Sequence, residues 1–350
     1  MSNAPPPDDQ LRFGLFLNMG ANLAAEPDDV FAITLRQAEL ADRLGYHDLW
    51  VTEHHFIPFG LNPSALSAAS FLLGRTANVR VGTAVALTPL HHPVALAEQS
   101  ALLARMSGGR FDLGIGRGGY VRDYEVFGVD TGRWGIEPEA TIDVLARARA
   151  GETLSASTPW FAFDDVSINP PMPDSGLGLF AATRSDGGIA VAAARGLPLL
   201  HYFAVPAEVR RVHEQRHAEA RCPSQPEPRH VHTLIVLVTD DPDTTRKRLA
   251  DSLLDLFIAG DWPKVPQASA GESRTAASRA TRVELAQSVA ANALIGRPEP
   301  LADEVAGYLE ATGARHLVMF MEPIADPELT LRSIERFATE VAPRVRELIR

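Results

Sequence analysis

The stretch FGLFL at residues 13–17, followed by a helical pattern over residues 28–44 and by HDLWVT at residues 47–52, decides the fold of this chain. Both apolar runs have the length and the nearly continuous apolar character of buried parallel strands. Between them, apolar side chains recur at the spacing of one helix face. A strand, a helix and a second strand in this order imply a right-handed crossover and a parallel sheet.

The same order of strand and helix continues to the end of the sequence. Further strands are predicted at residues 79–87, 111–116, 177–183, 197–204, 231–239 and 316–321. Further helices are predicted at residues 63–76, 93–106, 188–195, 206–220, 242–258, 301–312 and 328–348. Eight strands, each followed by a helix, are the pattern of a closed (β/α)8 barrel, also called a TIM barrel.

The length is that of one barrel with insertions. Such a barrel typically needs about 250 residues, so roughly 100 of the 350 residues are surplus. They fall after strands four and seven, at residues 151–176 and 260–287, whose composition is typical of linkers and mobile lids. We therefore predict one α/β domain over residues 13–350, with a mobile lid at 260–287 and a disordered tail over residues 1–12. An open doubly wound sheet is the alternative, but residues 13–20 lack the G-x-G-x-x-G turn that usually follows its first strand.

Charge and composition exclude several classes of protein. The 33 basic and 44 acidic side chains leave a formal charge of −11, so a nucleic acid or an anionic membrane would be repelled. Residues 81–97, a stretch without a charged side chain, are too short and too polar to span a membrane. Cys222 is the only cysteine, which excludes an intramolecular disulfide and a cysteine-based zinc cluster. Since residues 1–10 do not have the pattern of a secretion signal, we expect a cytoplasmic protein.

Histidines follow two of the predicted strands, and in a parallel barrel the active site gathers at the carboxyl ends of the strands. Glu53, His54 and His55 follow the second strand, and His91 and His92 follow the third. These side chains could bind a metal ion, but neighbours on an extended chain point to opposite sides, and no H-x-H or H-E-x-x-H spacing is present. We therefore expect no metal. At least two of the four histidines should hydrogen-bond within the fold, and one that faces inward could act as an acid or base.

Two glycine-rich segments indicate an anion site. GIGRGG at residues 114–119 ends the fourth strand, and TRSDGG at residues 183–188 begins the helix after the fifth. Glycine lets the backbone approach a ligand, arginine offers two donors to phosphate, and a helix start offers free N–H groups. Tight turns also need glycine, and Asp186 could be an ordinary N-cap. Two such features in an acidic chain favour a small phosphorylated cofactor, to which Arg133 could add a contact unless it is a solvated loop arginine.

Five blocks of sequence resemble the bacterial luciferase-like flavin-dependent monooxygenases in order and spacing. They are LWVTEHHF at 49–56, VGTAV at 81–85, HPV at 92–94, MSGGRF at 106–111 and GRG at 116–118. The resemblance is dense over residues 13–130, and weaker but continuous over 181–198 and 292–321. It implies a (β/α)8 barrel that binds FMN, usually as FMNH2 delivered by a separate flavin reductase. It further implies that O2 adds to the flavin C4a atom and that the resulting peroxide oxygenates an organic substrate, in this chain one of specialised metabolism.

The resemblance also assigns roles to individual positions. His54 corresponds to the family's catalytic histidine, with Glu53 beside it. The positions that match the family's phosphate contacts are Arg117, Arg133, Thr183 and Ser185. The positions that match its flavin-ring contacts are Ala84 and Val85, where relatives have a non-proline cis peptide, and Gly116. Because the light-emitting luciferase subunit has a reactive cysteine where this chain has Gly116, its aldehyde chemistry is not implied here.

Two other functions share this fold. One is hydride transfer with the deazaflavin F420, although its polyglutamate tail favours a basic surface and this chain carries a charge of −11. The other is a noncatalytic flavin-binding protein or partner subunit. The resemblance also implies a dimer that forms through the first helices, and we expect a homodimer.

Overall fold

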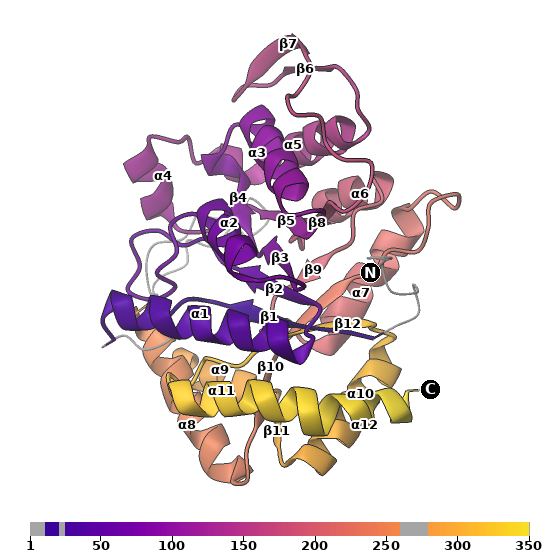
Figure 1. Ribbon diagram of the computed structural model, residues 1–350. Coiled ribbons are helices and arrows are strands. Elements are labelled where there is room, and N and C mark those ends of the chain that lie inside the picture. Colours follow the sequence, from indigo (N-terminus) through magenta and orange to yellow (C-terminus); the bar gives the residue numbers. More distant parts are fainter. Residues whose placement is uncertain (1–10, 21–24, 260–278, 350) are drawn as a thin grey trace.

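A closed ring of parallel strands surrounded by helices forms the body of the protein (Figure 1). The computed structural model describes residues 11–20, 25–259 and 279–349. Within these ranges the ring consists of β1 (Arg12–Leu17), β2 (Asp48–Val51), β3 (Arg80–Thr83), β5 (Phe111–Gly116), β8 (Gly178–Ala181), β9 (Leu200–His201), β10 (Val231–Val238) and β12 (His316–Phe320). Except between β8 and β9, each strand pairs in parallel with the next, and β12 pairs with β1. A single parallel bridge, Ala181 to Leu199, joins β8 to the segment that leads into β9. The predicted α/β class and parallel sheet are therefore confirmed.

Four further strands lie outside the ring. β4 (Ala86–Leu87) pairs with the end of β5, and β11 (Leu294–Gly296) pairs with the end of β10. The insertion at residues 151–176 contains an antiparallel hairpin of β6 (Leu154–Ser157) and β7 (Ala162–Val166), at the top of Figure 1.

Two predicted strands differ most from the structure. The strand expected at residues 79–87 is divided into β3 and β4, because the chain leaves the ladder after Thr83 and resumes pairing at Ala86. The peptide bond between them, Ala84–Val85, is cis. The strand expected at residues 197–204 is reduced to the two residues of β9.

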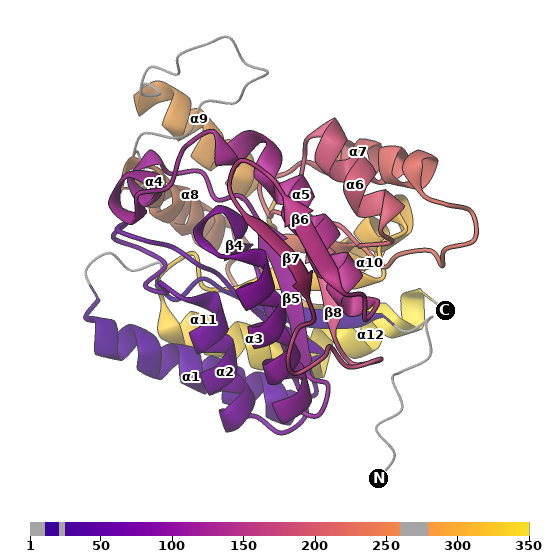
Figure 2. The ribbon, with the colours of Figure 1, turned by 90° about the horizontal axis from the view of Figure 1, so that it is seen from above.

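Helices cover the outside of the ring (Figure 2). They are α1 (Pro27–Leu44), α2 (Ala65–Arg75), the 3-10 turn η1 (Thr88–Leu90), α3 (Pro93–Met106), α4 (Val121–Phe127), α5 (Arg133–Arg149), α6 (Asp186–Ala194), α7 (Ala207–Ala220), α8 (Pro242–Ala259), α9 (Arg279–Ala291), α10 (Pro298–Thr312), α11 (Pro327–Arg336), the π-helical turn η2 (Phe337–Val341) and α12 (Ala342–Leu348). The helix predicted at 328–348 is thus one continuous run with a π turn inside it. α4 and α5 lie where no helix was predicted.

Two pairs of charged or titratable side chains lie at the amino-terminal ends of the strands. Arg80 at the start of β3 donates to Asp112 of β5 at 2.6 and 2.7 Å, and Asp48 at the start of β2 lies 2.7 Å from His316 at the start of β12. Gly14 is required beside them, because a Cβ there would lie 1.8 Å from Asp48 Oδ1. The opposite, carboxyl end of the ring is the end at which such barrels place their chemistry.

Part of the predicted domain layout lies outside the described residues. This holds for residues 1–10 of the predicted tail and for residues 260–278 of the predicted lid. Arg12 already belongs to β1, and residues 279–287 form the first part of α9. In the part of the chain that the structure describes, no helix is long and apolar enough to cross a membrane.

Candidate active site

The predicted site residues follow four strands that are neighbours in the ring. Glu53 and His54 follow β2, Ala84 and Val85 follow β3, Gly116 and Arg117 end β5, and Thr183 and Ser185 follow β8. Because β2, β3, β5 and β8 pair in that order, these residues occupy one continuous arc at the carboxyl end of the ring.

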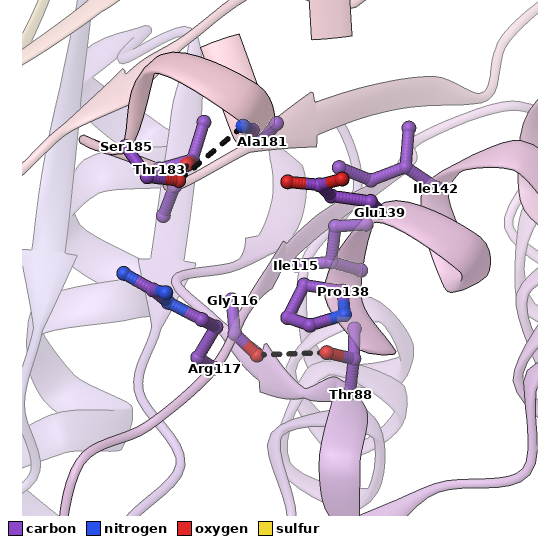
Figure 3. A pocket seen from close by; sticks show the side chains of 12 residues that line it. Thr88, Ile115, Gly116, Arg117, Pro138, Glu139, Ile142, Ala181, Thr183 and Ser185 are labelled. Atoms are coloured by element: carbon purple, nitrogen blue, oxygen red, sulfur yellow. Dashed lines mark hydrogen bonds between the residues drawn. The ribbon is translucent and has the colours of Figure 1, made fainter. Parts of the chain in front are cut away.

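A pocket brings four of these residues together (Figure 3). Its walls come from β5, α5 and the β8–α6 connection. The lining residues are Thr88, Ile115, Gly116, Arg117, Pro138, Glu139, Ile142, Ala181, Ala182, Thr183, Ser185 and Gly188. The structure therefore joins the two glycine-rich segments that the sequence indicated as anion sites.

The start of α6 supplies the hydrogen-bond donors of this pocket. Ser185 is the N-cap, and its Oγ accepts from the backbone N–H of Gly188 at 3.3 Å. Thr183 Oγ1 lies 3.4 Å from Ser185 Oγ. A Cβ at Gly188 would lie 2.1 Å from Thr183 Oγ1, so only glycine permits this approach. The alternative that Asp186 caps the helix is wrong, since Asp186 is the first helical residue and pairs with Arg216.

Arg117 is held beside the pocket by an aromatic ring. Its guanidinium carbon lies 3.9 Å from the centroid of the Trp134 ring, and Nη1 donates to the carbonyl oxygen of Trp134 at 3.4 Å. Trp134 is fixed in turn, because its indole N–H donates to the carbonyl oxygen of Gly118 at 3.0 Å. Burial, and then the neighbouring charge of Arg184, lower the pKa of Arg117. An anion between the two arginines would relieve that repulsion.

Glu139 is a pocket residue that the sequence did not indicate. It belongs to α5. Its Oε1 lies so close to Gly187 that a Cβ on this glycine would be only 2.5 Å away. Figure 3 shows its carboxylate across the pocket from Arg117, Thr183 and Ser185. The partial positive charge of a helix start attracts anions. The carboxylate of Glu139 therefore lies near a helix start that attracts anions.

The other predicted phosphate residue, Arg133, is the first residue of α5. It lies two turns before Glu139 on the same helix and is not among the described side chains that line the pocket. Its role in holding a phosphate remains a prediction.

Glu53 is the centre of a second, buried cluster. Its Oε1 lies 3.1 Å from Nε2 of His91 and 3.6 Å from Nε2 of His55, and its Oε2 accepts from the N–H of Ala65 at 3.3 Å. Burial disfavours its charge, but the close imidazoles of His55 and His91 outweigh burial and lower its pKa to about 2. Of the two, only His91 is within hydrogen-bond distance, since Nε2 of His55 is too far away at 3.6 Å. His91 comes from the next strand connection, 38 residues away, so no local spacing indicates this contact.

Neighbouring histidines diverge, as expected for an extended chain. His54 turns away from the Glu53 cluster and packs on Gly60, where a Cβ would lie 2.5 Å from its ring, and beside Phe59. Burial lowers the pKa of His54 to about 4, so its imidazole is neutral at pH 7. His92 packs against Phe161 and Phe163 of the insertion hairpin.

Glu322 follows β12 and links it to the segment after β1. The sequence did not indicate this residue. It accepts from the backbone N–H groups of Asn18 and Met19. Met19 in turn accepts from the N–H of Leu61, in the loop that packs on His54. Burial raises the pKa of Glu322 to about 7, against these hydrogen bonds.

The Ala84–Val85 peptide adjoins the pocket through Gly116. A Cβ on Gly116 would lie 2.7 Å from Cγ2 of Val85, so the valine methyl group occupies the space above the glycine. Gly116 is also paired with Leu87 of β4. The cis peptide segment and the carboxyl end of β5 therefore form one surface.

Comparison with known proteins identifies the family. A family model described as luciferase-like monooxygenase matches residues 11–316. The chain is 29% identical over 350 residues to 4-hydroxyprotoasukamycin monooxygenase of Streptomyces nodosus subsp. asukaensis, covering 96% of this chain and 92% of the relative. It is 26% identical to the alkanal monooxygenase alpha chain of Aliivibrio fischeri, covering 87% of this chain and 90% of the relative.

Solved structures share the fold at low sequence identity. Monooxygenase RslO1 from Streptomyces bottropensis superposes with a TM-score of 0.79 at 19% identity, covering 95% of this chain and 99% of that one. The oxygenating constituent of 3,6-diketocamphane monooxygenase of Pseudomonas putida, in complex with FMN, gives 0.72 at 19% identity, covering 96% and 98%. An F420-dependent secondary alcohol dehydrogenase also gives 0.72, at 17% identity, covering 96% and 99%. Together with the match of the family model over most of the sequence, these likenesses place the chain in the luciferase-like monooxygenase family of enzymes.

Proposed function

We propose that this enzyme is an FMNH2-dependent monooxygenase that uses O2 to oxygenate an organic substrate. The observation that carries the proposal is the pocket at the start of α6, where Arg117, Thr183 and Ser185 converge from two strand ends. A phosphate monoester needs charge-assisted donors at a helix start, and this pocket has them in a chain of net charge −11.

The residues of the pocket fit the phosphate end of FMN. Arg117, Thr183 and Ser185 would hold the phosphate oxygens, with Arg133 as a further contact. A phosphate at this point replaces the carboxylate of Glu139 as the anion at the start of α6, so Glu139 would turn aside on binding. Ala84, Val85 and Gly116 would lie against the flavin ring. Reduced FMN, when bound, supplies the electrons that activate dioxygen.

His54 and Glu53 have different tasks in this proposal. His54 is neutral at pH 7, because burial keeps its pKa near 4, and it can therefore accept a proton or donate its ring N–H near the reacting atoms. Glu53 is ionised and contacts His91 and His55 rather than His54. It would orient these two imidazoles and, through the N–H of Ala65, fix the start of α2.

Partners follow from this chemistry and from the surface. FMNH2 would come from a separate flavin reductase in the cytoplasm. The chain would form a homodimer through α1, α2 and α3, which lie next to one another (Figure 2). Large apolar side chains are exposed on these helices: Phe31, Phe71, Leu102 and Met106. A product of specialised metabolism is the proposed substrate class, supported by the similarity to 4-hydroxyprotoasukamycin monooxygenase.

Hydride transfer with F420 is the second candidate function. The likeness to an F420-dependent alcohol dehydrogenase favours it, and the net charge of −11 disfavours a cofactor with a polyglutamate tail. A noncatalytic flavin-binding protein is the third.

Two measurements separate these three functions. Purified protein is mixed with FMN or with F420 and the affinity is determined by fluorescence. Photochemically reduced FMN, isotopically labelled O2 and candidate substrates are then added, and the labelled oxygen in the products is measured by mass spectrometry, because free FMNH2 consumes O2 without an enzyme. The proposal expects FMN binding and labelled oxygen in a product. Binding of F420, its reduction by a substrate and no labelled product would support hydride transfer. Flavin binding that His54→Ala leaves unchanged, without turnover in either protein, would support the noncatalytic function.

A further inference from the structure

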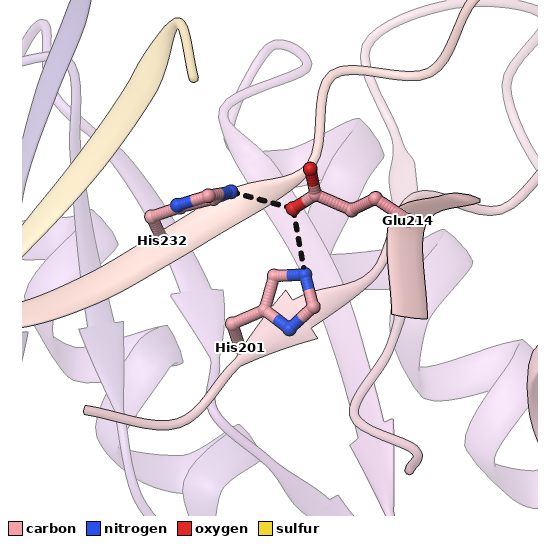
Figure 4. Close-up of side chains that lie close together, drawn as sticks. All are labelled: His201, Glu214 and His232. Atoms are coloured by element: carbon pink, nitrogen blue, oxygen red, sulfur yellow. Dashed lines mark hydrogen bonds and ion pairs between the residues drawn. The ribbon is translucent and has the colours of Figure 1, made fainter. Parts of the chain in front are cut away.

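A cluster of two histidines and one glutamate, side chains of the kinds that bind metal ions, lies outside the pocket (Figure 4). It consists of His201 at the end of β9, Glu214 on α7 and His232 near the start of β10. Glu214 Oε1 lies 2.9 Å from Nε2 of His201 and 2.6 Å from Nε2 of His232. The two histidines are buried, and the glutamate side chain keeps 18% of its surface exposed.

We propose that His201, Glu214 and His232 bind one divalent transition-metal ion, of the kind represented by Zn²⁺ or Co²⁺. Two imidazole nitrogens and one carboxylate oxygen form a donor set that such ions prefer. The three ligands come from three different elements and point to one place, as Figure 4 shows. Convergence of this kind distinguishes a metal site from a chance run of surface carboxylates.

The donor set suits a cation. One carboxylate and two neutral imidazoles would give a divalent site a net charge of about +1. The glutamate side chain reaches solvent on one side.

The surroundings of His232 allow the tautomer that a metal needs. A ligand at Nε2 requires the ring proton on Nδ1, and Nδ1 lies 2.7 Å from the hydroxyl oxygen of Tyr308. That oxygen also accepts from Nη1 of Arg210 at 3.1 Å. A hydroxyl can donate to an unprotonated Nδ1 or accept from a protonated one. Tyr308 therefore serves His232 with or without an ion, as the outer partners of metal-bound histidines usually do.

The side chains must adjust to admit the ion. Ligand atoms around a four-coordinate Zn²⁺ are about 3.3 Å apart, given metal–ligand distances of about 2.0 Å. The present distances of 2.6 and 2.9 Å are hydrogen bonds, so the carboxylate must retreat by about half an ångström. The three ligand atoms lie within 4.8 Å of one another, and the two imidazoles must also come within bonding distance of the ion. Glu214 can retreat because its side chain reaches solvent on one side, which also gives the ion a way in.

The position of the cluster indicates a structural role for the ion. His232 is the second residue of β10, far from the carboxyl end of that strand, where the barrel places its chemistry. An ion there would link α7 to both β9 and β10. β9, with two residues, is the shortest strand of the ring. The alternative is that the same three groups form a hydrogen-bonded lock that needs no metal.

Metal binding by the full-length protein without a histidine tag decides between these alternatives. The protein is dialysed against a chelator and titrated with Co²⁺, with visible absorption and calorimetry as readouts. We expect one ion per chain and the intense d–d bands of a four-coordinate ion, which added Zn²⁺ displaces. No binding of either ion to the wild-type protein would overturn the proposal without any recourse to variants.

Substitutions then locate the site. His232→Gln and Glu214→Gln should weaken Co²⁺ binding about 100-fold or more. His217→Gln is the matched control, because His217 is also a buried histidine at this interface but bonds to the carbonyl oxygen of Leu197; its Co²⁺ affinity should be that of the wild type. Circular dichroism of the metal-free proteins establishes that each variant is folded. Equal binding by the wild type, H232Q and E214Q would place the ion elsewhere and exclude this site.

Discussion

The guanidinium of Arg117 lies 3.9 Å from the centroid of the Trp134 ring, at the rim of the pocket that we propose for the FMN phosphate. The ring attracts the cation and restricts its position before any ligand binds. A pre-positioned arginine loses less conformational freedom on binding a phosphate than a mobile one.

Replacing Arg117 should therefore weaken FMN binding. A charge-assisted hydrogen bond contributes about 1.5–3 kcal/mol, so Arg117→Gln should raise the Kd for FMN about 10- to 100-fold. Riboflavin, which has no phosphate, should bind both proteins equally. Fluorescence titration measures both constants, and the exposed Arg344→Gln on α12 serves as the charge-matched control. An equal loss of FMN and riboflavin affinity would contradict a phosphate contact.

Ser185 should have both a structural and a binding role. Ser185→Ala removes the N-cap of α6, which should cost about 1 kcal/mol of unfolding free energy, and it also removes a phosphate ligand. Ser64→Ala removes the cap of α2, whose hydrogen bond has the same length of 3.3 Å. Both variants should lose similar stability in urea, but only Ser185→Ala should bind FMN more weakly. If both retain wild-type affinity, Ser185 does not contact the cofactor.

Gly116 is limited by the side chain of Val85. Gly116→Ala places a Cβ 2.7 Å from the valine methyl group and should destabilise the protein by about 1–3 kcal/mol. Val85→Ala removes the contact, so the double variant should regain most of that loss. Urea unfolding of the four proteins gives the coupling energy of the cycle. If the two substitutions have additive effects on the unfolding free energy, the Cβ at position 116 is accommodated by a movement other than that of Val85.

The charge of Glu53 should stabilise the folded protein at neutral pH. Its pKa is about 2 in the folded protein, against 4.5 for the ordinary group, so the folded state binds fewer protons. The stabilisation is complete above pH 4.5 and is lost as the pH falls through 2. Relative to Glu53→Gln, the wild type should lose about 2 kcal/mol between about pH 7 and about pH 3. Parallel pH dependences for the two proteins would show that the carboxylate is not held in this way.

Glu322 should have the opposite pH dependence. Its pKa is about 7 in the folded protein, so the folded state binds the additional proton and loses stability as the pH rises from 4.5 through 7. Glu322→Gln keeps an oxygen that can accept from Asn18 and Met19 but cannot ionise. The wild type should therefore lose roughly 2 kcal/mol relative to this variant between about pH 5 and about pH 8. Urea unfolding across this range provides the measurement, and a constant difference would contradict a buried carboxylate.

Periodicity predicted every strand of the ring, because buried parallel strands are short, apolar and separated by amphipathic helices. It did not predict the division between β3 and β4, since the residues 79–87 are uniformly suited to a strand and the interruption depends on pairing with β5. It also missed α5, whose first turns contain Trp134, Gly135 and Pro138 and so resemble a loop.

The sequence predicted those candidate site residues that stand together in one short segment or directly after a strand. Thr183 and Ser185 stand together at a helix start, and Arg117 follows directly after a strand. The contact of Glu53 with His91 and the approach of Glu139 to α6 join residues far apart in the sequence, and no local pattern specifies them. The two residues predicted to be catalytic, His54 and Glu53, are neighbours in the sequence, but the extended chain directs their side chains into different surroundings.

All residues proposed to hold the cofactor lie between positions 84 and 185, on β3, β5 and β8 and their connections, while β9, β10 and β12 contribute none of them. The two portions of the chain can therefore diverge separately in evolution. Exchanging the connections after β9, β10 and β12 for those of a relative would alter the mouth of the barrel without disturbing the phosphate cradle. If the proposed function holds, recombination downstream of α6 would change the substrate contacts and leave the residues proposed to hold the flavin unchanged.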